Sequence, residues 1–138
     1  GMIAFGEKLA ALFTPGSHGS TFAGNPLGAA AGLATLDVIE DENLVANAEA
    51  RGEQLRDGIM ATGNPLFVSV RGRGLLDAVE LKHPCSHAVM NYCLEHGLIV
   101  NAVAPNALRF APPLIVTAQD VDQALAILKD VPTDLPDD

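Results

Sequence analysis

The sequence predicts an α+β fold, in which a helical first part is followed by a compact unit with a mainly antiparallel sheet. The first observation is composition: 138 residues, 49% of them apolar and 18% charged, are enough to bury a core. The second is that apolar residues recur at helical spacing between residues 26 and 61. The third is a change of period after Pro65, which predicts the order β-β-α-β-β-α up to Lys129.

The first part of the chain is predicted to hold three helices and one long loop. Residues 3–5 form a short apolar stub, and residues 14–25 are rich in glycine and hydroxyl side chains. Asn25 and Pro26 have the residue types of an N-cap and a first helical position. We therefore expect helices at residues 7–13, 26–40 and 43–61.

The second part is predicted to hold four strands and two helices. We expect strands at residues 67–70, 75–81, 98–103 and 107–111, the first two joined through a turn at residues 71–74. A helix is expected from Pro84 to His96, with Gly97 in the left-handed C-cap position. Thr117 and Asp120 form a capping-box pattern ahead of the last helix. The acidic tail, residues 132–138, is expected to be frayed.

Charge and cysteine content restrict the class of protein. Acidic residues outnumber basic ones 17 to 8, giving a formal net charge of −9, so we expect no nucleic-acid partner and no membrane partner. Cys85 and Cys93, eight residues apart on one predicted helix, would be about 12 Å apart, which is too far for a disulfide. Free thiols and the absence of a visible signal peptide favour a cytoplasmic protein.

Two segments carry candidate chemistry. The loop from Ser17 to Asn25 places hydroxyls and glycine amides before a helix, which suits a phosphate, although a turn with an N-cap explains the same residues. Arg109 lies between Leu108 and Phe110 in an apolar strand and should point to the opposite face. Its guanidinium suits either a substrate carboxylate or an internal Asp or Glu.

Two other patterns predict no site. His83, Cys85, His87, Cys93 and His96 lie close in sequence, but no pair of them has the spacing of a closed zinc site, so we expect no metal. The single Arg-Gly-Arg-Gly run at residues 71–74 is interpreted as a hairpin rather than as a nucleic-acid segment.

Taken in order, four motifs resemble class III aminotransferases, which are pyridoxal-phosphate enzymes, and within them the acetylornithine aminotransferases. The motifs are His-Gly-Ser-Thr-Phe-Ala-Gly-Asn-Pro-Leu at residues 18–27, Val-Arg-Gly-Arg-Gly-Leu at 70–75, Gly-Leu-Ile-Val-Asn at 97–101 and Leu-Arg-Phe-Ala-Pro-Pro-Leu at 108–114. The likeness extends from about Ile3 to Lys129. Asp77 departs from it, because the corresponding strand is more apolar in the family.

The resemblance implies a fold-type I homodimer that uses pyridoxal 5′-phosphate. Ser20 and Thr21 would donate hydrogen bonds to the cofactor phosphate across the dimer interface, and Gly19 would permit close approach. Arg109 would bind a substrate carboxylate. The implied reaction, a step of arginine biosynthesis, moves an amino group from N-acetylornithine to 2-oxoglutarate.

The resemblance also implies domain boundaries. Residues 1–25 would be a remnant of the large cofactor-binding domain, 26–62 the interdomain helices, 63–131 the small C-terminal domain and 132–138 the tail. The family's Schiff-base lysine would precede residue 1, and none of the three lysines of this chain takes its place. We therefore expect a C-terminal fragment that is inactive alone. The alternatives are a self-contained binding or dimerisation module with an anion loop, or a piece of an ornithine or succinyl-diaminopimelate aminotransferase.

Overall fold

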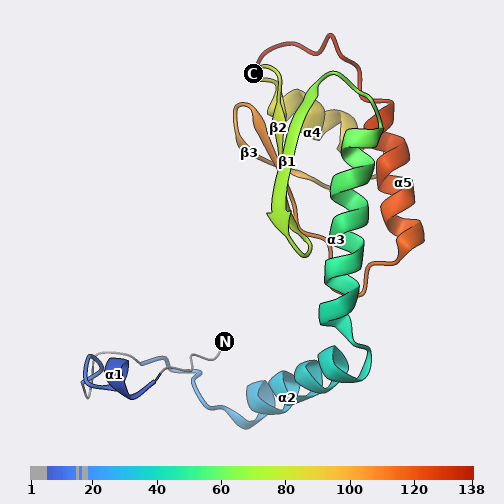
Figure 1. Ribbon diagram of the computed structural model, residues 1–138. Coiled ribbons are helices and arrows are strands. Elements are labelled where there is room, and N and C mark those ends of the chain that lie inside the picture. The colour runs from blue at the N-terminus through green and yellow to red at the C-terminus, as the bar shows by residue number, and fades with distance from the viewer. Residues whose placement is uncertain (1–5, 15, 17–18) are drawn as a thin grey trace. The chain divides into compact units, whose positions relative to one another are not determined.

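The computed structural model describes residues 6–14, 16 and 19–138 of the chain (Figure 1). The stub expected at residues 3–5 and the loop residues Ser17 and His18 lie outside the described residues. The chain divides into two compact units, Gly1–Asp37 and Val38–Asp138, which are treated separately below.

The first unit contains helix α1 (Glu7–Ala10) and most of helix α2 (Pro26–Asp41). Helix α1 is shorter than predicted because the chain leaves it through turns, in which the Phe13 amide donates to the Ala10 carbonyl. Helix α2 begins at Pro26 as predicted, and the Asn25 side-chain oxygen accepts a hydrogen bond from the Gly28 amide at 2.7 Å. No residue of α2 is buried in the described chain.

The second unit confirms the predicted β-β-α-β-β-α order and the mainly antiparallel sheet. Its elements are α3 (Leu44–Ala61), β1 (Phe67–Arg73), β2 (Leu76–Leu81), α4 (Ser86–Glu95), β3 (Asn101–Ala104), β4 (Ala107–Phe110) and α5 (Ala118–Lys129). The strands form one antiparallel sheet in the order β1-β2-β4-β3. Helix α3 contacts β1 and α5, and α4 contacts β3 and β4.

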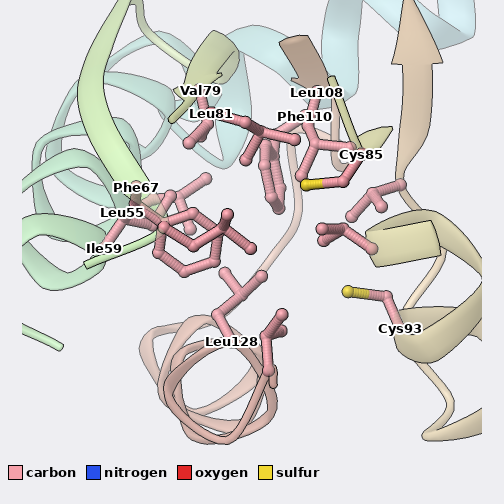
Figure 2. Close-up of a cluster of buried hydrophobic side chains, with 14 of the residues drawn as sticks. Leu55, Ile59, Phe67, Val79, Leu81, Cys85, Cys93, Leu108, Phe110 and Leu128 are labelled. Carbon is pink, nitrogen blue, oxygen red and sulfur yellow. The ribbon is translucent and has the colours of Figure 1, made fainter. Parts of the chain in front are cut away.

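The two faces of the sheet have opposite character. The core face buries alternate strand residues against the helices, and Figure 2 shows their side chains converging with those of α3, α4 and α5: the labelled core residues are Leu55, Ile59, Phe67, Val79, Leu81, Cys85, Cys93, Leu108, Phe110 and Leu128. The other face, here called the open face, carries the residues between them: Ser69, Arg71, Arg73, Leu76, Ala78, Glu80, Asn101, Ala107 and Arg109. Strand alternation therefore separates an apolar surface from a charged one.

Several boundaries differ from the predictions. The turn between β1 and β2 is Gly74–Leu75, so both arginines of the Arg-Gly-Arg-Gly run lie within β1 rather than in the turn. Gly74 has φ +57°, which a side chain would disfavour. Helix α4 begins at Ser86 instead of Pro84, and Gly97 has the expected positive φ of +87°.

Helix α3 belongs to the second unit, and the assignment of residues 26–62 to an interdomain segment stays a prediction. Leu55 and Ile59 of α3 are buried in the same cluster as the sheet residues Val79 and Leu108. The boundary between the compact units therefore falls within α2, after Asp37. The physical reason is that the apolar side of α3 is covered by the sheet and α5.

The sequence predicts a frayed tail, and the structure places the end of that tail against α4. The Asp138 carboxylate accepts hydrogen bonds from the Ser86 hydroxyl and from the His87 and Ala88 amides, at 3.0–3.3 Å. The amides of a first helical turn have no partner within the helix, so a carboxylate there is stabilised. Partial burial raises the pKa of Asp138, but these hydrogen bonds outweigh it and bring that pKa to about 2.

Both cysteines are free, as predicted, and the structure places both of them in the core. Cys85 and Cys93 are each 0% exposed and lie within the core (Figure 2). Burial raises the pKa of the Cys93 thiol to about 11. Because the thiolate is the reactive form, both side chains act as small apolar groups rather than as nucleophiles.

Asp77 is the charged residue of the core face, and the structure gives it a partner. Its side chain is fully buried, and Oδ1 lies 3.0 Å from Nη1 of Arg56 on α3. The same Nη1 donates to the Gly74 carbonyl at 3.0 Å, so Arg56 links α3 to the β1–β2 turn. Gly52 permits the approach, since a Cβ there would lie 1.7 Å from the Gly74 oxygen. Within the described chain, Asp77 Oδ2 has no hydrogen-bond partner.

Removing the guanidinium of Arg56 should destabilise the second unit strongly. Arg56→Met keeps most of the aliphatic stem but leaves a buried carboxylate without its cation, so we expect a loss of about 3 kcal/mol in unfolding free energy. Urea unfolding at neutral pH measures it. Arg51→Met, on the same helix, is the matched control and should cost less than about 1 kcal/mol. A loss at Arg56 no larger than the control would contradict this role.

Asp77 should also make stability depend on pH. Burial raises the pKa of Asp77 above its ordinary 3.8, and the nearby Arg56 only partly opposes that rise. Between pH 3.8 and the raised pKa of Asp77, the folded chain binds more protons than the unfolded chain. The contribution of Asp77 to the unfolding free energy therefore falls as pH rises through this range. The stability of Asp77→Asn relative to the original chain should therefore increase from pH 3.8 upward and then level off. Urea unfolding at a series of pH values would show a flat difference if the idea is wrong.

Candidate functional site

The predicted anion loop exposes its key residues. Gly19, Ser20 and Thr21 are all exposed, directly ahead of a turn in which the Ala23 amide donates to the Ser20 carbonyl at 3.1 Å. The Ser20 hydroxyl accepts a hydrogen bond from the Phe22 amide at 3.4 Å. The described part of the loop, residues 19–25, is thus a compact turn in which Ser20 and Thr21 are exposed.

Ser20 and Thr21 differ in how far their hydroxyls are engaged. The Ser20 oxygen stabilises the turn, but in the described part of the chain the Thr21 hydroxyl has no hydrogen-bond partner. Asn25 completes the loop by donating from Nδ2 to the Phe22 carbonyl at 2.8 Å and accepting from the Gly28 amide. Both interpretations made from the sequence therefore remain compatible: the segment is a turn with an N-cap, and it also offers an unused hydroxyl to an anion.

Arg109 occupies the predicted orientation in the second unit. Its neighbours Leu108 and Phe110 are buried on the core face, whereas Arg109 is exposed on the open face of β4. Antiparallel pairing places it opposite Asn101 on β3 and Ala78 on β2. Strand alternation alone accounts for an arginine at the surface of so apolar a segment.

The partner of Arg109 is a neutral amide. Nη2 of Arg109 donates to Oδ1 of Asn101 at 3.1 Å, and no carboxylate of the described chain forms an ion pair with the guanidinium. A guanidinium has five N–H donors, so most of them remain available. The sequence left two partners open for Arg109, a substrate carboxylate and an internal Asp or Glu. Among residues 6–14, 16 and 19–138, no Asp or Glu forms an ion pair with Arg109.

A cavity opens beside Arg109. Its volume is about 360 Å³, and its lining includes Arg109, Asn101, Phe110, Pro113 and Asp120. Most of the lining is apolar, which is typical of a pocket in which a few polar groups set the orientation of a ligand. Asp120 is held by its capping-box contacts with Thr117, which lower the pKa of its carboxyl. No lysine is among the lining residues.

The histidines and cysteines do not gather into a site. Within the described residues, no group of three His, Cys, Asp or Glu side chains is arranged to hold a metal ion. His83 pairs with Asp137 at 2.6 Å and His87 with Asp138 at 2.9 Å, whereas His96 stacks on Tyr92. These contacts attach the tail and cap α4.

Two residues near Arg109 were not singled out by the sequence. Asn101 is the last residue of the Gly-Leu-Ile-Val-Asn motif, and Arg71 is predicted to lie in the turn at residues 71–74. Alternation along each strand predicts that Asn101 and Arg71 lie on the open face, but only the register between strands places them in the cross-strand row of Arg109.

Among the helices of the described chain, none is long and apolar enough to span a bilayer.

Comparisons with known sequences agree with the motifs. The family model of class-III aminotransferases matches residues 2–131. The acetylornithine aminotransferase of Gloeobacter violaceus is 45% identical over 129 residues, covering 91% of this chain and 32% of the relative. The ornithine aminotransferase of Staphylococcus carnosus is 43% identical over 132 residues, covering 94% of this chain and 32% of the relative. The chain thus spans about a third of the length of these relatives.

Solved structures confirm the fold. The acetylornithine aminotransferase from Elizabethkingia anophelis matches with a TM-score of 0.75 at 38% identity, over 87% of this chain and 33% of that one. The ornithine δ-aminotransferase of Plasmodium falciparum matches with a TM-score of 0.79 at 31% identity, over 89% of this chain and 33% of that one. The matched part is their C-terminal portion. Sequence motifs, fold and family model agree, and the chain belongs to the class III aminotransferases.

Proposed function

We propose that this chain serves an aminotransferase that moves an amino group from N-acetylornithine to 2-oxoglutarate, as in arginine biosynthesis. The observation that carries the proposal is Arg109: an exposed guanidinium in an apolar strand, beside an apolar cavity, held by a neutral amide instead of a carboxylate. Both substrates carry a carboxylate, which a guanidinium binds through two parallel hydrogen bonds. Asn101 would position the guanidinium without neutralising it.

The loop of the first unit fits a phosphate. Gly19 leaves the backbone accessible, and the Thr21 hydroxyl is exposed without a partner in the described chain, so Thr21 and Ser20 would hold the phosphate of pyridoxal 5′-phosphate. When bound, this cofactor supplies an electron-withdrawing ring that carries the amino group between substrates. In a homodimer, these residues would act on the cofactor of the partner subunit.

The covalent step requires a lysine, and no lysine lines the cavity beside Arg109. The lysines of this chain are Lys8, Lys82 and Lys129, and all are exposed. We therefore propose that the chain is inactive alone and contributes phosphate-binding and carboxylate-binding groups to a larger enzyme. Ornithine is the second candidate donor, favoured by the 43% identity to the Staphylococcus carnosus ornithine aminotransferase.

A chimera tests the function in an active context. The chain would replace the matched third of the Gloeobacter violaceus acetylornithine aminotransferase, and transamination would be measured with acetylornithine and with ornithine. We expect activity with a preference for acetylornithine. Arg109→Gln should raise the KM for 2-oxoglutarate at least tenfold because a charge-assisted carboxylate contact is lost. Arg109→Lys should restore the low KM only in part, since a lysine cannot form two parallel hydrogen bonds with a carboxylate.

The chimera has a built-in control. Lys129→Gln removes a cation from the exposed end of α5 and should leave both kinetic constants unchanged. If Arg109→Gln matches that control, Arg109 does not bind the substrate carboxylate. A folded chimera that prefers ornithine would transfer the proposal to the second donor.

The isolated chain should not bind the cofactor covalently. We expect a titration with pyridoxal phosphate, followed by borohydride reduction and peptide mapping, to trap none of the three lysines specifically. The physical reason is that all three lysines are exposed, whereas a lysine nucleophile is activated by desolvation in an apolar pocket. A saturable visible band mapping to Lys8, Lys82 or Lys129 would show that the chain builds a cofactor site of its own.

A further inference from the structure

Arg109 and Asn101 both line the cavity, and they form a directly opposed pair on neighbouring strands. The antiparallel register places Asn101 of β3 opposite Arg109 of β4, and Nη2 of Arg109 donates to Oδ1 of Asn101 at 3.1 Å. Directly opposed residues point to the same face, where a pair of opposite charges is favourable. In a chain with 17 acidic residues, the cation at this position nevertheless faces a neutral amide.

The chemistry of the two side chains fixes which way the amide of Asn101 is turned. A guanidinium carries donors only, so it pairs with the amide oxygen, and the Nδ2 group of Asn101 then faces away from Arg109. Among the described residues, the Nδ2 donors have no hydrogen-bond partner, and Arg109 donates only to Asn101. The free groups of the pair are therefore N–H donors, with no acceptor among them.

The acidic side chains around Arg109 are held by hydroxyl groups instead. Glu80 is the diagonal neighbour of Arg109 on β2, and its Oε2 accepts a hydrogen bond from the Ser69 hydroxyl at 3.0 Å. Asp120 also lines the cavity, and its Oδ2 accepts from the Thr117 amide at 2.9 Å and from the Thr117 hydroxyl at 2.6 Å. Within the described chain, neither carboxylate forms an ion pair with Arg109.

A ligand group that offers only acceptors fits such a pair. A carboxylate presents two oxygens to the donors, whereas a carboxamide of the same shape replaces one oxygen by an NH2 group that would face other donors. The remaining lining of the cavity is mostly apolar, so it attracts both kinds of ligand and does not distinguish them. The distinction therefore depends on the pair of Arg109 and Asn101.

We infer that Asn101 is a specificity-determining residue: it holds Arg109 without neutralising it, keeps the pair free of acceptors, and so makes the cavity select a carboxylate over a carboxamide. The inference rests on the proposed carboxylate role of Arg109 and extends it to a second residue. In Asn101→Asp the guanidinium would keep its charge, but that charge would be satisfied within the protein and closed to a ligand.

The test uses the chain itself with two probes of the same shape, 4-methylpentanoate and 4-methylpentanamide. Dissociation constants would be measured at low ionic strength from the NMR shifts of the backbone amides of Ala111 and Val116, which line the cavity. Because a charge-assisted hydrogen bond is stronger than a neutral one but is weakened by exposure, we expect the carboxylate to bind about fivefold more tightly than the carboxamide.

Two substitutions at position 101 separate charge from mere contact. Asn101→Asp keeps the shape of the side chain and should abolish or reverse the preference for the carboxylate. The same variant should unfold at an equal or higher urea concentration than the original chain, because the new carboxylate pairs with Arg109. A purely structural role of Asn101 predicts no loss of the preference. Asn101→Ala should keep part of it, since the guanidinium stays charged but is no longer oriented.

Asn106→Asp is the matched control. It introduces the same charge at an exposed turn residue between β3 and β4 that does not line the cavity, so the preference should stay within twofold of the original. If Asn106→Asp reduces the preference as much as Asn101→Asp, the effect is one of overall charge and the inference is overturned.

The remaining outcomes distinguish the inference from the proposed function. The inference alone is overturned if Arg109→Gln abolishes the preference while Asn101→Asp keeps it, or if Asn101→Ala keeps all of it. If Arg109→Gln leaves the preference intact, the carboxylate role of Arg109 fails, and the role of Asn101 fails with it.

Discussion

One-sided burial of the four-stranded sheet is the constraint on which the second unit depends. The helices bury only the core face, so every strand must alternate between an apolar residue and one that tolerates water. In β2 and β4 this alternation is strict: Val79 and Leu108 are buried, whereas Ala78 and Arg109 are not. A slip of β1 or β4 by one residue would drive an arginine into the core, so packing fixes the register and the register fixes the composition of the open face.

Asp77 is a charged residue on the otherwise apolar core face, and its burial is compensated by a cation. A carboxylate on the core face is unfavourable unless a cation reaches it, and Arg56 reaches it from α3 while also binding the Gly74 carbonyl. The same contact ties the β1–β2 turn to the helix. Because that turn is confined to Gly74 and Leu75, Arg71 remains within β1 and stays in the row of Arg109.

Membership of the class III aminotransferases gives these features a chemical context. The chain spans about a third of its relatives, and its described residues include a threonine hydroxyl with no hydrogen-bond partner in one unit and a guanidinium with no ion pair in the other. Both groups suit anions, and neither performs covalent chemistry. The proposed division of labour is that this part binds and orients, while the lysine that makes bonds to the cofactor comes from elsewhere in the enzyme.

The sequence by itself determined the elements, their order and the orientation of Arg109, because these depend on local signals. Alternation in Leu108–Phe110, the capping box of Thr117 and the glycine after α4 all act within a few residues. Only the tertiary structure decided which residues meet. The partner of Asp77, the docking of Asp138 on α4 and the row that joins Arg71 to Arg109 each link positions 21 to 52 residues apart, whose pairing depends on how helices and strands pack rather than on any local pattern.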